Sequence, residues 1–305
     1  MKKLPIKKVT FHNRYGITLV GDLYEPKNKN GKLSAIAVCG PFGAVKEQAS
    51  GLYAMTMAER GFITLAFDAS YTGESGGLPR YMNSPDINTD DFSAAVDYLS
   101  LKDNVDPEKI GIIGICGFGG YSLNAAAIDP RIKATVVSTM YDMTRVTAYG
   151  YNDVTTVDER YKTRIQLGKQ RIEDYKNGYY QTAGGLPDER PSEPLYLQQY
   201  YDYYKTPRGY HKRSLNSNKG WLTTSQLGML NAKILQFTDE IQNAVLMIHG
   251  ELAHSYYMGQ TAYEKLKGDN KEFLAIPGAY HCDLYDNLTA IPFDKITEFM
   301  NNNLK

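Results

Sequence analysis

The chain has 305 residues, and its 34 Lys and Arg are balanced by 34 Asp and Glu, so its formal net charge is zero. This balance argues against a nucleic-acid-binding protein, which usually carries a basic excess, and against a polybasic membrane anchor. Hydrophobic residues make up 42% of the chain and charged residues 22%, which is typical of a folded globular protein and not of a disordered one.

The sequence also bears on the location of the protein. The segment after Met1 is positively charged, but Lys7, Lys8 and His12 interrupt any apolar stretch behind it, so we expect no signal peptide. No run of 18 apolar residues occurs, which predicts no membrane span. Three cysteines are too few, and odd in number, for a disulfide framework. We therefore expect a cytoplasmic protein with reduced thiols.

Strand and helix patterns alternate along most of the chain. A β-rich hairpin over 8–11 and 17–20 precedes a series of apolar strands separated by stretches with helical spacing. The expected strands cover 33–39, 62–67, 110–115, 134–138, 244–248 and 272–276, and the expected helices include 86–101, 119–128, 260–266 and 293–301. This alternation predicts an α/β protein with a mostly parallel central sheet and helices on both faces.

The alternation stops over residues 143–243, where the sequence is polar and rich in tyrosine. Thirteen of the 25 tyrosines lie between Tyr141 and Tyr210. We predict a core formed by 1–142 and 244–305, with 143–243 as a mainly helical lid insertion. Tyrosine combines an apolar ring with a hydroxyl, which suits a substrate pocket, but such clusters also attach an insertion to its sheet or form the interface of a homodimer.

The string Gly-Ile-Cys-Gly-Phe-Gly-Gly-Tyr at 114–121 joins an apolar strand to a helix of small residues. This is the context of a nucleophile elbow, in which a strained turn lifts one side chain above the sheet. Cys116 holds the nucleophile position, where the helix N-terminus favours the thiolate. The usual spacing is Gly-x-nucleophile-x-Gly, whereas Phe118 stands where the second glycine is expected. Cys116 is therefore the nucleophile of an altered elbow, which we favour, or a buried structural residue.

Further motifs accompany the elbow: Cys-Gly-Pro-Phe-Gly at 39–43, the Gly-rich loop within 67–76, Ile-His-Gly at 248–250 and Pro-Gly-Ala-Tyr-His at 277–281. With these motifs the chain resembles the α/β-hydrolase superfamily, and in particular its dienelactone-hydrolase-like branch, with kinship to bacterial hydrolases and polyketide-transferase-type acyltransferases. The resemblance covers most of the chain outside 143–243. It implies an α/β-hydrolase fold and a small-molecule acyl substrate.

The resemblance also implies a general base and an acid. His281, in a loop after the last strand, matches the position of the superfamily's histidine, whereas His249 fits a structural role better. The usual position of the acid is occupied by Ala253, which leaves two candidates open. Asp142, after the strand that follows the elbow helix, is favoured over Glu251. Asp142 would otherwise cap the first helix of the insertion, and a Cys–His pair can also work with a weaker orienting group.

Acyl transfer also needs hydrogen-bond donors for the oxyanion. One should be the N–H of Gly117, directly after the nucleophile. The other should come from the loop after the strand at 33–39, where Pro41 has no N–H and Phe42 is the expected donor. We expect no metal, because His249 and His254 lack the spacing of a metalloprotease pair, and no dinucleotide cofactor, because the glycines at 117–120 do not complete the G-x-G-x-x-G pattern.

Three functions remain open on this basis. The first is a hydrolase of an ester, lactone or thioester that works through an acyl-thioenzyme on Cys116. The second is an acyltransferase with the same chemistry. The third is a non-catalytic binding protein on a hydrolase scaffold, suggested by the alanine at 253 and the altered glycine pattern.

Overall fold

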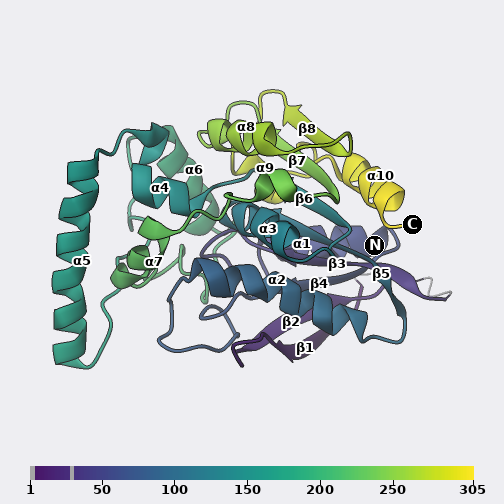
Figure 1. Cartoon of the computed structure of the whole chain (residues 1–305), viewed down its shortest axis with the longest axis horizontal. Helices are drawn as coiled ribbons and strands as arrows, with labels where there is room; N and C mark the ends of the chain where they lie inside the picture. Colours follow the sequence, from purple (N-terminus) through teal and green to yellow (C-terminus); the bar gives the residue numbers. More distant parts are fainter. Residues whose placement is uncertain (1–3, 28–30) are drawn as a thin grey trace.

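The computed structural model describes residues 4–27 and 31–305 (Figure 1). Residues 1–3, which begin the segment assessed for a signal peptide, lie outside the described residues. No helix of the described ranges is both long enough and apolar enough to cross a membrane.

Eight strands form one sheet. Their bounds are β1 (Ile6–His12), β2 (Thr18–Tyr24), β3 (Leu33–Cys39), β4 (Ile63–Phe67), β5 (Val105–Ile115), β6 (Ala134–Ser138), β7 (Ala244–Gly250) and β8 (Lys271–Ile276). The order across the sheet is β1-β2-β4-β3-β5-β6-β7-β8. Strands β3 to β8 run parallel to one another, whereas β1 pairs antiparallel with β2, and β2 pairs antiparallel with β4.

Helices cover both faces of this sheet. The helices are α1 (Ala49–Glu59), α2 (Pro85–Ser100), α3 (Gly117–Ile128), α4 (Met143–Tyr149), α5 (Val157–Asn177), α6 (Leu195–Tyr204), α7 (Gln226–Asn231), α8 (Tyr256–Lys265), α9 (Asp283–Asp286) and α10 (Phe293–Asn303). One apolar cluster joins the sheet to α2, α3 and α8, and a second joins its other face to α1 and α10. The predicted α/β architecture is confirmed.

The parallel strands place the candidate site residues together. Phe42 follows β3, Cys116 follows β5, Asp142 follows β6 and His281 follows β8. Because parallel strands end at the same edge of a sheet, loops that are far apart in sequence converge at their carboxyl ends.

The segment between β6 and β7 contains α4 to α7 and three short 3₁₀ turns, at Tyr151–Asp153, Thr223–Ser225 and Thr238–Glu240. In Figure 1 these helices gather at the end of the molecule away from both termini, and the long helix α5 forms its outer edge. The assignment of 143–243 as a lid remains a prediction.

Candidate functional site

Cys116 occupies a sharp turn between β5 and α3. Its backbone has φ 56° and ψ −124°, a conformation that non-glycine residues rarely adopt. Gly114 makes this turn possible, because a Cβ at that position would lie 2.3 Å from the carbonyl oxygen of Phe118. Phe118, which replaces the glycine of the usual pattern, is buried and packs edge-on against Phe92 and Tyr121. The altered pattern therefore still forms a strained strand–turn–helix unit.

The thiol of Cys116 lies in a closed environment, since the residue is only 6% exposed. Burial raises the pKa of the thiol, and hydrogen bonding by the Tyr285 hydroxyl, the N–H groups of Gly117 and Phe42 and the Tyr200 hydroxyl opposes that rise. The pKa of the thiol is raised overall. Burial therefore outweighs the lowering of the thiol pKa that was expected from the helix N-terminus. The two N–H groups predicted as oxyanion donors are among the groups that lower the pKa of this thiol, and their role toward an oxyanion remains a prediction.

His281 is fully buried. Its Nδ1 lies 2.6 Å from Ser255 Oγ and 3.0 Å from Thr139 Oγ1, and its Nε2 lies 3.1 Å from the Tyr285 hydroxyl. Burial lowers the pKa of His281 well below its usual value, and the neighbouring His254 and His249 lower it further. The imidazole is therefore neutral at rest.

Tyr285 connects the two predicted catalytic side chains. Its hydroxyl hydrogen-bonds with His281 Nε2, and the same hydroxyl lowers the pKa of the Cys116 thiol. Tyr285 lies in the short helix α9, and His281 precedes the N-cap residue of that helix. Sequence analysis missed this residue, although its four-residue spacing from His281 was visible.

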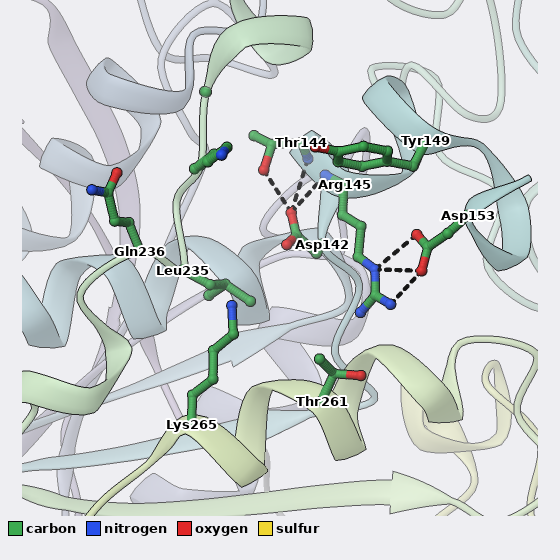
Figure 2. A pocket seen from close by; sticks show the side chains of 11 residues that line it. Asp142, Thr144, Arg145, Tyr149, Asp153, Leu235, Gln236, Thr261 and Lys265 are labelled. Atoms are coloured by element: carbon green, nitrogen blue, oxygen red, sulfur yellow. Dashed lines mark hydrogen bonds and ion pairs between the residues drawn. The ribbon is translucent and has the colours of Figure 1, made fainter. Parts of the chain in front are cut away.

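The predicted acids lie elsewhere. Asp142 is the N-cap of α4, and its Oδ1 accepts hydrogen bonds from Thr144 N at 3.0 Å, Thr144 Oγ1 at 2.7 Å and Arg145 N at 2.9 Å. Figure 2 shows this carboxylate at the wall of a cavity of about 660 Å³, with Arg145 paired to Asp153 beside it. Glu251 is exposed and accepts a hydrogen bond from Gly278 N at 3.4 Å.

The partners of His281 Nδ1 are thus hydroxyl groups, whereas the sequence predicted a carboxylate. Thr139 directly follows β6, and Ser255 lies two residues beyond the usual acid position at 253. Their sequence separations from His281, 142 and 26 residues, explain why no local pattern pointed to them.

An aromatic shell from the tyrosine-rich segment closes the site. The ring of Tyr200, from α6, lies 5.6 Å from that of His281, and Tyr141 lies 5.9 Å from it. His254, 4.9 Å from His281, stacks on Tyr196 at 4.6 Å. Tyr196 and Tyr200, both from residues 143–243, therefore pack against His254 and the predicted base His281.

Comparison with known proteins places this geometry in a family. The model of the X-Pro dipeptidyl-peptidase (S15) family matches residues 15–279. The chain belongs to this family of α/β hydrolases. An uncharacterized protein of Pseudomonas aeruginosa is 56% identical over 304 residues, covering 99% of this chain and 82% of its own length. The protein YcjY of Escherichia coli K12 is 34% identical, covering 92% of each chain.

Solved structures agree with the fold of this S15-family chain. The crystal structure of a hypothetical protein from Pseudomonas aeruginosa has a TM-score of 0.97, with 55% identity, and covers 99% of this chain and 95% of its own. The α/β hydrolase GrgF of a Penicillium species has a TM-score of 0.81 at 20% identity, covering 99% of both chains, which supports the fold alone.

The predicted kinship to polyketide transferases is also confirmed. The polyketide transferase claH of Penicillium crustosum is 32% identical over 131 residues, covering 43% of this chain and 42% of its own. A thiohydrolase of Aspergillus aculeatus is 33% identical over 129 residues, covering 42% and 40%. The assignment to the dienelactone-hydrolase-like branch remains a prediction.

Proposed function

We propose that this protein cleaves an ester, lactone or thioester through an acyl-thioenzyme on Cys116, with His281 as general base. The observation that carries the proposal is the position of Cys116, which is buried in a strained turn at the N-terminus of α3. Four groups lower the pKa of its thiol against the effect of burial: the N–H groups of Gly117 and Phe42, the Tyr285 hydroxyl and the Tyr200 hydroxyl. The Tyr285 hydroxyl in turn hydrogen-bonds with His281.

The first step starts from neutral groups, because burial raises the pKa of the thiol and lowers that of the imidazole. As Cys116 Sγ bonds to the substrate carbonyl carbon, the thiol proton passes to the Tyr285 oxygen and the Tyr285 proton passes to His281 Nε2. The carbonyl oxygen gains the negative charge and accepts hydrogen bonds from Gly117 and Phe42. His281 Nε2 then gives its proton to the leaving group as the tetrahedral intermediate collapses.

Ser255 acts as the orienting group in this scheme, in place of Asp142 or Glu251. For Nε2 to accept a proton, Nδ1 must carry the other one and donate it to a hydroxyl oxygen, and Ser255 Oγ lies 2.6 Å away. A hydroxyl stabilises an imidazolium less than a carboxylate does. Weaker stabilisation of the imidazolium suits activated acyl substrates such as thioesters, because their leaving groups depart readily.

A second candidate is acyl transfer to a small-molecule acceptor by the same acyl-thioenzyme. Similarity to the fungal polyketide transferase and thiohydrolase supports either outcome, since those names describe transfer and hydrolysis respectively. The two candidates differ only in whether water or another nucleophile attacks the acyl-thioenzyme.

Turnover of a panel of activated esters and acyl thioesters, with and without added alcohol and amine acceptors, tests the proposal. We expect Cys116→Ala to abolish turnover and Cys39→Ala, at another buried cysteine, to retain it. Products that form only with an acceptor would favour transfer over hydrolysis. Full activity of Cys116→Ala would overturn the proposed nucleophile.

A further inference from the structure

Helix α5 presents an apolar stripe to solvent. Five of its side chains are strongly exposed: Val157 at 68%, Tyr161 at 64%, Ile165 at 43%, Ile172 at 66% and Tyr175 at 92%. We call these residues the α5 stripe. Their spacing of three, four or seven residues keeps them on one side of the helix. A continuous exposed apolar surface of this kind usually marks an interaction site.

The stripe is separate from the side by which α5 packs on its own chain. That packed side contains the buried residues Leu167 and Asp174, seven residues apart. Asp174 Oδ1 accepts hydrogen bonds from Gln170 and from Gln181 N. In Figure 1, α5 runs along the outer edge of the molecule. The stripe is therefore free for a partner without displacement of the helix.

Four of the five stripe residues lie nearly symmetrically about Gly168, and Val157 has no counterpart within α5. Positions 161 and 175 are each seven residues from it, and 165 and 172 are three and four residues from it. A second α5, antiparallel and related by a two-fold axis at Gly168, would set Tyr161 against the partner's Tyr175 and Ile165 against the partner's Ile172. A Cβ at Gly168 would have no neighbour within 4 Å, so the helices can approach closely at the crossing point.

The charges beside the stripe suit the same arrangement. Asp158 and Lys176 lie near opposite ends of α5 on one flank, as do Lys162 and Glu173. Antiparallel pairing brings Asp158 near the partner's Lys176 and Lys162 near the partner's Glu173, and each pair occurs twice by symmetry. None of these four side chains forms an ion pair within the described residues of its own chain.

Two of the arginines on the other flank, Arg160 and Arg164, are held by their own chain. Arg160 donates a hydrogen bond to the carbonyl oxygen of Thr155 at 2.9 Å, and Arg164 donates one to Asn231 Oδ1 at 3.2 Å. Because the guanidinium groups of Arg160 and Arg164 bind their own chain, these two positive charges are directed away from the proposed two-fold axis.

We propose that the α5 stripe is a homodimer interface, in which α5 of one chain packs antiparallel against α5 of a second copy. Symmetry of the apolar positions and complementarity of the charges both select a second copy of this chain over an unrelated partner. The proposal is independent of the chemistry at Cys116.

Sedimentation velocity of the full chain over a concentration series tests the interface. We expect a species of twice 34.2 kDa for the wild type. Ile165→Glu and Ile172→Glu should each give monomers at the same concentrations, with the circular dichroism spectrum of the folded wild type, because both residues are exposed. Leu101→Glu is the matched control: Leu101 is 86% exposed but lies outside α5, so this variant should stay dimeric.

Disulfide formation tests whether the two-fold axis of the proposed dimer passes near Gly168. The native cysteines are buried, so Gly168→Cys introduces the accessible thiol, which should cross-link two chains under mild oxidation. Gln166→Cys, on another face of the same helix, should not. A wild type that stays monomeric at every concentration would overturn the proposal. So would a dimer that persists in both glutamate variants, or equal cross-linking of the two cysteine variants.

Discussion

At Cys116, burial and hydrogen bonding act on the thiol in opposite directions, and burial prevails. Because His281 is also neutral, the resting site holds no thiolate–imidazolium pair. In the proposed mechanism, the thiol is activated only when substrate arrives and the proton moves to His281. A neutral, enclosed thiol is also protected from adventitious alkylation and oxidation, since both reactions require the thiolate.

Tyr285→Phe tests the path of that proton. Loss of the hydroxyl interrupts the connection between Cys116 and His281, so acylation of Cys116 should slow by about 100-fold, the usual scale for a proton-transfer group. Stopped-flow acylation with an activated ester measures this rate. Tyr203→Phe is the control, because its ring packs on Tyr285 at 5.0 Å but its hydroxyl is not part of this path. Equal rates for Tyr285→Phe and wild type would rule out the relay.

Variants of Asp142 test whether its carboxylate is the acid of a catalytic triad or only a helix cap. Because its carboxylate caps α4, Asp142→Ala should lower the free energy of unfolding by about 1 kcal/mol, and Asp142→Asn should change it little, since asparagine caps equally well. Both variants should keep turnover within a few-fold of wild type. A triad acid would behave differently, with Asp142→Asn reducing turnover by about 10⁴-fold. Chemical denaturation and steady-state kinetics separate the two roles.

At the scale of the elements, the turn between β5 and α3 depends on the close approach of the Gly114 backbone to that of Phe118. Gly114→Ala should destabilise the protein by about 1–3 kcal/mol, because the new methyl group meets the Phe118 carbonyl oxygen and the Ser122 hydroxyl, each 2.3 Å from the Cβ position. Gly228→Ala, in α7, is the control. Its Cβ would meet only Pro85 Cδ at 3.7 Å, so stability should be unchanged or slightly higher. Equal melting temperatures for the two variants would contradict this account of the turn.

The elements of the core were predictable from sequence, but the contacts of His281 were not. Apolar runs bounded by turn residues identified the strands of the sheet, and the small-residue string at 114–121 identified the turn. Asp142 was recognised both as a candidate acid and as a candidate cap. Only the positions of Thr139 and Ser255, brought together by β6 and the loop after β7, decide which groups reach His281 Nδ1. Such long-range juxtaposition leaves no periodic signal in the sequence.

At the scale of the whole molecule, three histidines couple stability to pH: His249 and His281 are buried and His254 is half-buried. Burial lowers the pKa of His249 to about 4 and that of His254 to about 4, and it lowers that of His281 well below 6.5. The unfolded chain binds protons at these residues below about pH 6.5, whereas the folded chain does not. The stabilisation is therefore complete above about pH 6.5 and is lost as the pH falls, by up to about 1.4 kcal/mol per pH unit for each histidine.

Urea denaturation between pH 7 and pH 5 measures this dependence. His254→Asn should reduce the slope of unfolding free energy against pH by about one third, because one of the three coupled residues is removed. His12→Asn, at an exposed position, should leave the slope unchanged. A stability independent of pH over this range would contradict neutral burial of the three imidazoles.

The central claim is an acyl-thioenzyme on Cys116, and intact-mass spectrometry tests it most directly. Wild type, Cys116→Ala and Cys39→Ala are exposed briefly to an activated acyl ester and to an acyl thioester. We predict an increase of one acyl group in wild type and Cys39→Ala and none in Cys116→Ala, with persistence of the adduct when no acceptor is present if the enzyme is a transferase. An adduct of equal yield on Cys116→Ala, or none on wild type with either reagent, would contradict the account.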